Sequence, residues 1–392
     1  MKISSLCVKS ANNKETTHPH QLPIYATSSF VFQEVEDSID IFTGKIEGHV
    51  YSRYGNPTVD AVAEKISQLE TYGSDVEAFG LMTSSGMSAI STVIASLFQK
   101  GDKLITQGNL YGGTTELIKK VFVKMGMEAA FIDLTDLNLL EDHLKQDTEI
   151  KMIYFETPSN PTLDCIDIEG IVALAKKHNV KTVVDNTFCT PYLQQPLIMG
   201  VDYVIHSTTK YLSGHGNTIA GSIIGRKEDK APVWQHLKLM GTNCNPFDAW
   251  LVNNGLKTLS LRMDRHSENA LQLAEYLQNH KAVNKVNYNG LTDHRFHELA
   301  KKQMSQFGGM LSFEIGGGKE AALKCMNKLK FCTQAPTLGD VDTLILHPAT
   351  SSHLNIPASM RRENGISDGL IRVSVGIGDI EDLKDDFEQA FA

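Results

Sequence analysis

The sequence predicts an α/β protein with a mainly parallel sheet, followed by a smaller α+β unit. Short apolar runs alternate with longer segments whose apolar residues have helical spacing, and this alternation is typical of parallel βα units. Several runs also end in polar residues, as strands do where a ligand binds at the carboxyl edge of such a sheet. The predicted strands are 103–106, 129–132, 152–155, 182–184, 203–205 and 222–224.

The predicted elements divide into an arm and two larger units. Residues 1–55 lack clear periodicity and have a polar start from Lys9 to His20, so we expect an arm. Helical spacing over 59–69 and 88–99 opens a large doubly wound unit, 56–245. A long helical stretch, 248–277, then leads into the smaller unit, 246–392. A chain of 392 residues is long for one core, which favours two domains.

Composition excludes several classes of function. Hydrophobic residues at 41% and charged residues at 21% describe an ordinary globular protein. The formal charge of −9 makes nucleic acid or an anionic membrane an unexpected partner. No apolar run reaches the length of a membrane span, and the cysteines are scattered without CxxC spacing. We therefore expect a cytoplasmic enzyme with no metal site.

Lys210 and Asp185 follow two of the predicted strands, 203–205 and 182–184. A partly desolvated lysine at a strand end has a lowered pKa and is nucleophilic enough to bind an aldehyde cofactor covalently. Pyridoxal phosphate also needs a carboxylate at its ring nitrogen, which keeps the ring an electron sink. Each residue alone is compatible with an ordinary polar loop. Together they indicate a covalent cofactor site.

The sequence around these residues resembles the pyridoxal-phosphate attachment segment of the Cys/Met-metabolism enzymes, which include methionine γ-lyases, cystathionine γ-lyases and γ-synthases, and sulfhydrylases. The matching residues are Asp185-Asn186-Thr187-Phe188, Gln195-Pro196-Leu197, Gly200, Asp202, His206-Ser207-Thr208-Thr209-Lys210 and Gly214-His215. The resemblance runs from about residue 22 to the C-terminus. It implies an aminotransferase-like fold of type I, with 56–245 as the cofactor-binding domain and pyridoxal 5'-phosphate covalent at Lys210.

The cofactor phosphate requires an anion site. Ser85, Gly86 and Met87 open a predicted helix, so their free backbone N–H groups would face an anion. Ser207 and Thr209 can add hydroxyl donors. Taken alone, the first segment is an ordinary helix N-cap. The resemblance is what assigns it to the phosphate.

The resemblance also assigns the remaining site residues. Tyr111 matches the tyrosine that stacks on the cofactor ring and acts as a general acid or base, and Asn160 matches the contact to the ring hydroxyl. Arg372 would bind the substrate α-carboxylate with its planar guanidinium, and Thr337 is also expected to bind the substrate. Without the resemblance, these residues read as a loop tyrosine, a Pro-flanked turn and an arginine on a solvated strand face.

Tyr51 and Arg53 match a motif that reaches the phosphate from a neighbouring subunit, where the arginine pairs with the anion. The arm, 1–55, would then contribute to a second copy of the chain. We expect a homo-oligomer, a tetramer built as a dimer of dimers.

The expected reaction is γ-elimination on a sulfur amino acid, from L-methionine or homocysteine to 2-oxobutanoate, ammonia and a thiol. Segments 245–250, 337–344 and 347–353 are more similar to methionine γ-lyases and sulfhydrylases than to cystathionine enzymes. Gly113 departs from that pattern, because methionine γ-lyases typically carry a cysteine there, and Asp342 stands where lyases often have glutamate. A cystathionine γ-lyase, or γ-replacement by a cystathionine γ-synthase or O-acetylhomoserine sulfhydrylase, stays open as an alternative.

Two readings outside this family are weaker. A nicotinamide-dependent dehydrogenase of similar layered fold would need a GxGxxG segment opening its first helix, and the sequence has none. A catalytically inactive scaffold would normally have lost Lys210 or Asp185.

Overall fold

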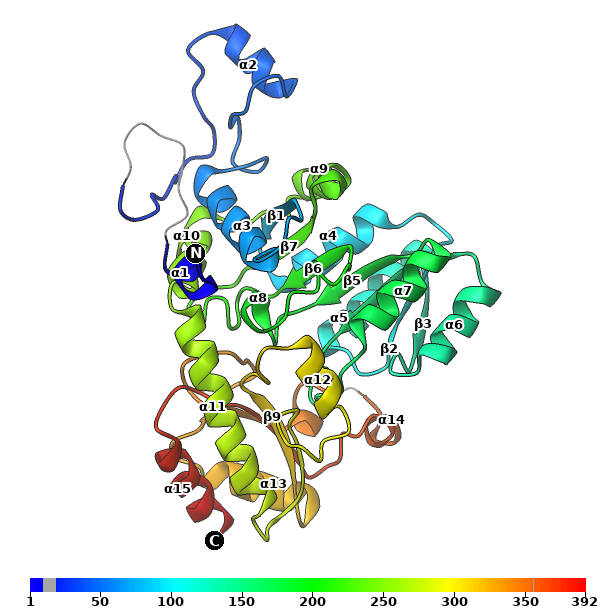
Figure 1. Ribbon diagram of the computed structural model, residues 1–392, viewed down its shortest axis with the longest axis vertical. Coiled ribbons are helices and arrows are strands. Elements are labelled where there is room, and N and C mark those ends of the chain that lie inside the picture. The colour runs from blue at the N-terminus through cyan, green and yellow to red at the C-terminus, as the bar shows by residue number, and fades with distance from the viewer. Residues whose placement is uncertain (10–18, 355) are drawn as a thin grey trace.

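The structure of the chain is a computed structural model that describes residues 1–9, 19–354 and 356–392. It contains a seven-stranded sheet and a five-stranded sheet, with helices packed around both (Figure 1). Every strand of the larger sheet lies before residue 245 and every strand of the smaller sheet after it. The α/β class with a smaller α+β unit is confirmed, whereas the domain boundary at 245/246 stays a prediction.

The larger sheet has the strand order β1-β7-β6-β5-β4-β2-β3. Strands β2 to β6 are parallel to one another, as predicted. The prediction is wrong for β7, which runs antiparallel to both β1 and β6, because the chain between β6 and β7 forms no crossover helix. The strands are β1 (Ala78–Thr83), β2 (Lys103–Gln107), β3 (Glu128–Ile132), β4 (Ile150–Glu156), β5 (Lys181–Asp185), β6 (Tyr203–His206) and β7 (Gly221–Arg226).

Side chains alternate between two apolar faces of this sheet, because successive residues of a strand point in opposite directions. Val183 and Ile205 pack in the cluster that includes α4 and α9. Val184 and Val204 pack in the cluster that includes α3 and α7. The helices of this part are α3 (Pro57–Glu70), α4 (Gly86–Leu97), α5 (Gly112–Leu117), the short turns η1 (Ile118–Phe122) and η2 (Val123–Met125), α6 (Leu137–Gln146), α7 (Ile168–His178), α8 (Thr190–Leu193), η3 (Lys227–Asp229) and α9 (Lys230–Met240).

The predicted helical stretch 248–277 is two helices, α10 (Pro246–Leu256) and α11 (Leu259–Gln278). Figure 1 shows α11 running along the side of the molecule from the larger sheet to the smaller one. The smaller sheet has the order β10-β11-β12-β9-β8. Its elements are β8 (Val283–Asn287), α12 (His297–Gln303), β9 (Met310–Ile315), α13 (Gly318–Lys328), β10 (Thr333–Gln334), β11 (Leu344–Leu346), η4 (Pro348–Thr350), α14 (Ala358–Glu363), β12 (Leu370–Ser374) and α15 (Ile380–Phe391).

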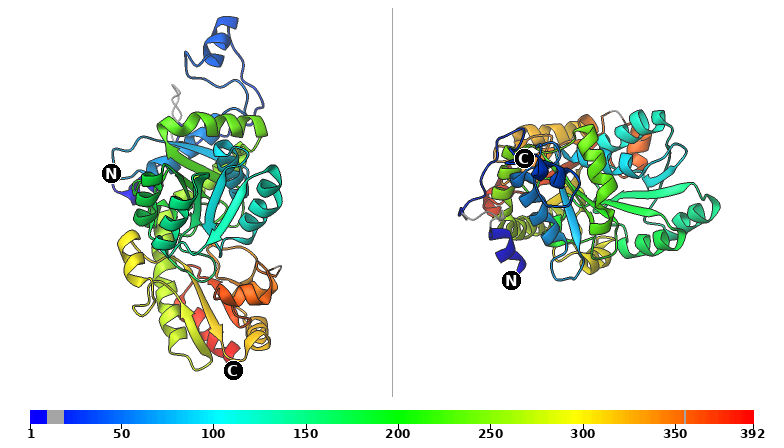
Figure 2. Two further views of the ribbon diagram at one scale, coloured as in Figure 1. Left: turned by 90° about the vertical axis from the view of Figure 1, so that its right-hand side faces the viewer. Right: turned by 90° about the horizontal axis from the view of Figure 1, so that it is seen from above.

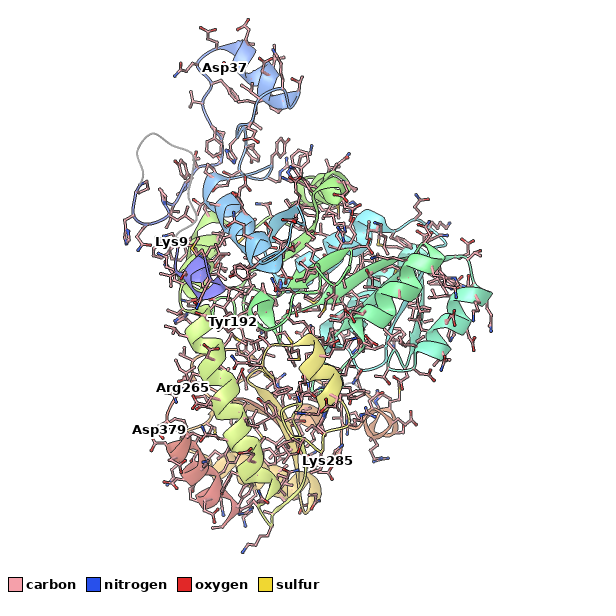
Figure 3. The ribbon with its side chains drawn as sticks, in the orientation of Figure 1. Lys9, Asp37, Tyr192, Arg265, Lys285 and Asp379 are labelled. Atoms are coloured by element: carbon pink, nitrogen blue, oxygen red, sulfur yellow. The ribbon has the colours of Figure 1, made fainter. Side chains whose placement is uncertain are left out.

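The segment that carries α2 (Val35–Phe42) stands apart from this body and has no buried residue in its helix. The first helix, α1 (Ile3–Val8), packs against α3 and α11 and buries Cys7. Figure 3 shows Asp37 of α2 at the far end of the molecule, and the left view of Figure 2 places this segment beyond the packed layers. Its apolar side chains are exposed to solvent, with Val31 97% and Val35 71% exposed. Most of the predicted polar start, Lys9–His20, lies outside the described residues.

Candidate active site

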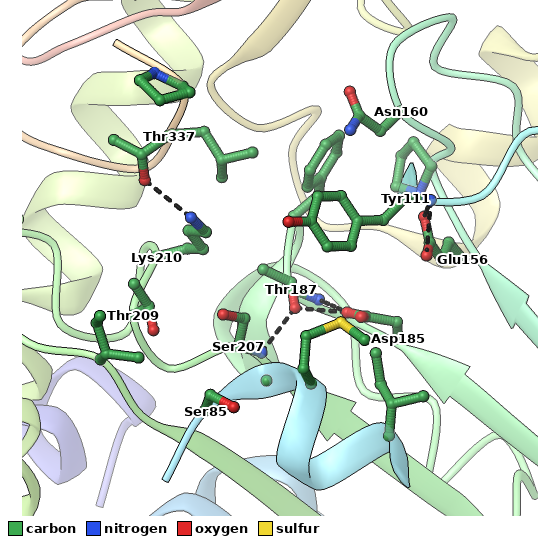
Figure 4. Close-up of a pocket in the computed structure, with 18 of the residues that line it drawn as sticks. Ser85, Tyr111, Glu156, Asn160, Asp185, Thr187, Ser207, Thr209, Lys210 and Thr337 are labelled. Atoms are coloured by element: carbon green, nitrogen blue, oxygen red, sulfur yellow. Dashed lines mark hydrogen bonds between the residues drawn. The ribbon is translucent and has the colours of Figure 1, made fainter. Parts of the chain in front are cut away.

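A cavity of about 280 Å³ lies at the carboxyl ends of β4, β5 and β6 and is closed by segments of the smaller sheet (Figure 4). Ligands of open α/β sheets bind at this edge. The cavity brings together most of the predicted site residues. They are Ser85, Gly86, Met87, Tyr111, Asn160, Asp185, Ser207, Thr209, Lys210, Thr337 and Arg372.

Lys210 lies in the loop after β6 and points into the cavity (Figure 4). Its Nζ donates a hydrogen bond of 2.8 Å to Oγ1 of Thr337. Burial, together with the nearby charge of Arg372, lowers the pKa of Lys210 to about 8. The amine is therefore close to neutral in mildly alkaline solution, as a nucleophile or a base must be.

Asp185 closes β5 and is held by Thr187. The backbone N–H and the hydroxyl of Thr187 both donate to Oδ1 of Asp185, at 3.0 and 2.5 Å, and Thr187 Oγ1 accepts from the backbone N–H of Ser207 at 2.8 Å. Burial raises the pKa of Asp185, and the two hydrogen bonds from Thr187 oppose that shift. The carboxylate is thus fixed in orientation beside the loop that carries Lys210.

The first turn of α4 forms the lower end of the cavity. Ser85 caps this helix, its Oγ accepting from the N–H of Ser88 at 3.0 Å. A Cβ on Gly86 would lie 2.7 Å from Cβ of Ser207, so only glycine lets the helix start and the Lys210 loop approach so closely. Free N–H groups of a helix of 12 residues and nearby hydroxyls make this end suited to an anion.

Tyr111 is positioned by Glu156, which closes β4. Both carboxyl oxygens of Glu156 accept from the backbone N–H of Tyr111, at 3.1 and 3.0 Å. Burial raises the pKa of Glu156 well above its usual range, and the neighbouring Asp185 raises it further. The two carboxyls stand opposite each other in the β4–β5 register. Burial beside Asp185 therefore disfavours the charged form of Glu156.

Arg372, on β12, brings a buried cation to the wall of the cavity formed by the smaller sheet. Its Nη2 donates to the carbonyl of Thr337 at 2.9 Å and its Nη1 to Oδ1 of Asn160 at 3.4 Å, while Nε is buried without a partner. Among the described residues it has no carboxylate partner within ion-pair distance. A guanidinium in this state is suited to a planar anion such as a carboxylate.

This arrangement agrees with what the chain is similar to. The family model for Cys/Met metabolism PLP-dependent enzymes matches residues 4–392. A cystathionine β-lyase of Lactococcus lactis subsp. cremoris is 45% identical, over 96% of this chain and 95% of the relative. An L-methionine γ-lyase of Fusobacterium nucleatum subsp. polymorphum is 42% identical, over 94% and 92%. The chain belongs to the Cys/Met metabolism PLP-dependent enzyme family.

Solved structures agree in fold. A putative O-acetylhomoserine (thiol)-lyase from Campylobacter jejuni, crystallised with N'-pyridoxyl-lysine-5'-monophosphate, superposes with a TM-score of 0.94 at 32% identity and full coverage of both chains. The fold of type I that the sequence predicted is confirmed, and so is the dependence on pyridoxal phosphate. The enzyme is a carbon–sulfur lyase of sulfur amino acid metabolism.

Tyr51 and Arg53 lie outside the cavity of this enzyme. Tyr51 is 42% exposed, and the Arg53 guanidinium packs over the rings of Tyr51 and Tyr54, at 5.6 and 4.9 Å from their centroids. Arg53 also donates to the carbonyl of Lys238 and lines a second cavity. Within one chain, these two predicted residues therefore do not meet Lys210.

The sequence did not single out Glu156 or Thr187 as site residues. Glu156 obeys the rule that identified Asp185, since it directly follows the predicted strand 152–155. Thr187 follows Asp185 by two residues, the spacing at which an aspartate accepts from the backbone ahead of it. Ile219, Pro336 and Leu338 also line the cavity and carry no sequence signal, because their approach depends on tertiary packing.

Within residues 1–9, 19–354 and 356–392, none of the helices is long and apolar enough to cross a membrane. The described His, Cys, Asp and Glu side chains also form no cluster that would hold a metal ion.

Proposed function

We propose that this enzyme holds pyridoxal phosphate on Lys210 and eliminates the γ-sulfur of L-methionine or L-homocysteine, giving 2-oxobutanoate, ammonia and a thiol. The observation that carries the proposal is that one cavity is lined by an amine of lowered pKa, a fixed carboxylate and a buried, unpaired guanidinium. These are Lys210, Asp185 and Arg372.

The residues present fit the cofactor at both of its ends. Asp185, oriented by Thr187, would hold the protonated ring nitrogen, and the first turn of α4 with Ser207 and Thr209 would hold the phosphate. Tyr111, whose N–H is fixed by Glu156, would stack on the ring, and Asn160 would contact the ring hydroxyl. When bound, the cofactor supplies an electron sink that stabilises negative charge at the substrate Cα.

The chain's own groups would then position the substrate and move protons. Arg372 would bind the α-carboxylate with its free Nε edge, which places Cα near Lys210. Lys210, whose pKa is lowered to about 8, would take the proton from Cα. Thr337 accepts from Lys210 and so would steady the amine between proton transfers. Tyr111 is the group placed to give a proton to the departing sulfur.

A single chain is incomplete in this proposal. Tyr51 and Arg53 would reach the phosphate of a neighbouring copy through the arm, in a tetramer built as a dimer of dimers. The exposed apolar side chains around α2 support a subunit interface at this segment, because exposed apolar patches mark contact surfaces. We place the oligomer in the cytoplasm, which agrees with six free, buried cysteines.

The first test addresses Lys210. A Lys210→Ala variant is expected to lose the visible absorption of the bound cofactor and to turn over at least about 10²–10⁴-fold more slowly, because one amine serves as tether and base. Borohydride reduction of the wild type, followed by peptide mass analysis, is expected to mark Lys210. Lys227→Ala, at an exposed lysine, is the matched control. Unchanged absorption and turnover in Lys210→Ala would remove Lys210 from the proposal.

The second test addresses the substrate. We expect kcat/KM to be higher for L-methionine or L-homocysteine than for L-cystathionine, or than for O-acetylhomoserine with sulfide. Gly113 weighs against methionine, since a Cβ there would lie 2.6 Å from the ring of Tyr111, so the space of the usual cysteine is filled. Asp342 is exposed and does not line the cavity. Pyruvate from cystathionine would indicate β-elimination, and a preference for replacement would also overturn the choice.

A further inference from the structure

A buried polar cluster lies behind the cofactor site, on the opposite face of the larger sheet. Its centre is a contact of 2.7 Å between Nε2 of His206, at the end of β6, and Oε1 of Glu70, at the end of α3. Both side chains are fully buried. Asn186 joins them, its Nδ2 donating to Oε1 of Glu70 at 3.1 Å and to the carbonyl of Gln194 at 2.8 Å.

The strand register fixes where this cluster lies. Asp185 pairs with Ile205, and both side chains point to the face of the sheet that carries α4. Asn186 and His206 are the next residues of their strand ends, so their side chains point to the other face. The ends of β5 and β6, which carry Asp185 and the Lys210 loop on the cavity face, are thus both linked to Glu70 on the opposite face of the sheet.

The same cluster reaches the end of β4. Gln194 Nε2 donates to Oδ1 of Asn186 at 3.1 Å and to the carbonyl of Thr157 at 3.3 Å. Thr157 follows Glu156, which holds Tyr111 in the cavity. Three adjacent strand ends therefore share one hydrogen-bonded support, and each carries a group that faces the cofactor.

If a carboxylate and an imidazole in contact at full burial are both charged, each charge offsets part of the desolvation cost of the other. Oε2 of Glu70 and Nδ1 of His206 have no partner among the described residues, while Oε1 of Glu70 contacts His206 and accepts from Asn186. The other titratable groups nearby are the Cys189 thiol, whose pKa is raised by burial and also by Glu70, and Asp185 across the sheet. At Asp185, burial raises the pKa most, while Thr187 and the charge on His206 lower it.

We propose that Glu70 and His206 form a buried ion pair that positions the strand ends under the cofactor and keeps Asp185 ionised from behind the sheet. Glu70 and His206 are positioning residues, since neither lines the cavity. The inference rests on the proposed function in taking Asp185 as the partner of the ring nitrogen.

The test uses the holoenzyme and compares Glu70→Gln, His206→Gln and the double variant with Glu64→Gln, which removes an exposed carboxylate from the same helix. Both glutamine side chains keep a hydrogen-bonding group in place, so His206→Gln serves if Glu70→Gln does not fold. The readouts are the rate at which the cofactor is lost on dilution and the pH midpoint of its visible absorption.

Each single variant is expected to lose the cofactor about tenfold faster, the equivalent of one pKa unit at Asp185. The absorption midpoint is expected to move to higher pH by about one unit, because a ring with less positive charge lets the lysine linkage keep its proton longer. The double variant is expected to match the singles, and Glu64→Gln to match the wild type.

An unchanged midpoint in Glu70→Gln and His206→Gln would overturn the electrostatic part of the inference, even if both variants melted at lower temperature. Multiplicative losses in the double variant would show that the two residues act independently, and would overturn the pair. The proposed function fails separately, if Lys210→Ala keeps the cofactor band.

Discussion

Burial acts in opposite directions on the two central residues of the site. Desolvation disfavours the charged form of any group, so it lowers the pKa of Lys210 and raises that of Asp185. Under the proposed function, the lowered pKa suits the Lys210 amine to act as a base, whereas the raised pKa works against an Asp185 carboxylate that would need to stay ionised. Thr187 and His206 both oppose that second shift. Hydrogen bonds and a nearby charge therefore oppose the effect of burial at Asp185, whereas at Lys210 burial is the main cause of the pKa shift.

His266, on α11, gives a pH-dependent contribution to stability. Burial lowers its pKa to about 4, its Nδ1 lies 2.6 Å from the carbonyl of Val375, and its ring packs edge-on to Tyr211 beside Lys210. An unfolded histidine takes up its proton near pH 6.5, so the unfolded state binds more protons between pH 6.5 and 4, and stability falls as the pH falls through that range. The loss from this residue between pH 7 and 5 is expected to be about 2 kcal/mol.

Urea unfolding of wild type and His266→Gln at both pH values checks this expectation. The variant is expected to lose less stability than the wild type on acidification, while His143→Gln, on the outer helix α6, loses as much as the wild type. Equal losses in wild type and His266→Gln would assign the acid sensitivity to other groups.

At this scale, the sequence predicted the cavity residues that lie at or just after the end of a strand. Lys210 and Asp185 were found in this way. Glu156 obeys the same rule but was not predicted as a site residue, because a glutamate at a strand end is also common on protein surfaces. Glu70 could not be found, since its partner His206 is 136 positions away and only the packing of α3 under the sheet brings them together.

The strands and helices were largely predictable because apolar periodicity reports burial directly. The direction of β7 was not predictable. It depends on the connection from β6, and a connection of the length of 207–220 is compatible with a parallel or an antiparallel strand. The break between α10 and α11 was also missed. Apolar spacing continues across it, and the residues at the break, Lys257 and Thr258, are neither proline nor glycine.

One carboxylate fixes the C-terminal helix to the smaller sheet. Asp386, 6% exposed on α15, accepts from the backbone N–H groups of Lys330, Phe331 and Cys332 at 2.8, 2.9 and 3.2 Å. Asp386→Asn keeps the shape but replaces one acceptor oxygen with a donor. We expect a loss of about 2–3 kcal/mol in the free energy of unfolding, because three N–H groups, that of Cys332 buried and the other two partly buried, lose a charged acceptor.

The urea midpoint of Asp386→Asn measures this loss, and Asp385→Asn, at an exposed position of the same helix, is the control. A midpoint equal to that of the control would mean that the loop 330–332 finds other acceptors.

At the scale of the whole molecule, the arm determines whether one chain is enough for activity. If Arg53 acts in a neighbouring copy, Arg53→Ala and Lys210→Ala chains complement each other, because one site of a mixed dimer takes both intact residues. Random mixing of two inactive variants in a two-fold dimer is expected to restore about a quarter of wild-type activity. Activity of co-expressed, separately tagged chains measures this recovery.

The control carries both substitutions in one chain and is mixed with wild type, which cannot create an additional complete site. Proven mixed oligomers of the single variants without recovered activity would place Arg53 and Lys210 in the same protomer, or assign Arg53 no part in the site.

The antiparallel strand β7 also bears on the order in which a newly made chain can mature. β1 has β7 as its neighbour in the sheet and leads directly into α4, whose first turn forms the anion end of the cavity. A ribosome must therefore release the chain as far as Arg226 before β1 gains a place in the sheet. By then Lys210 has already been synthesised. Under the proposed function, a nascent chain between these two points would carry the attachment amine without its phosphate site, so we expect the cofactor to be loaded only after translation has passed β7.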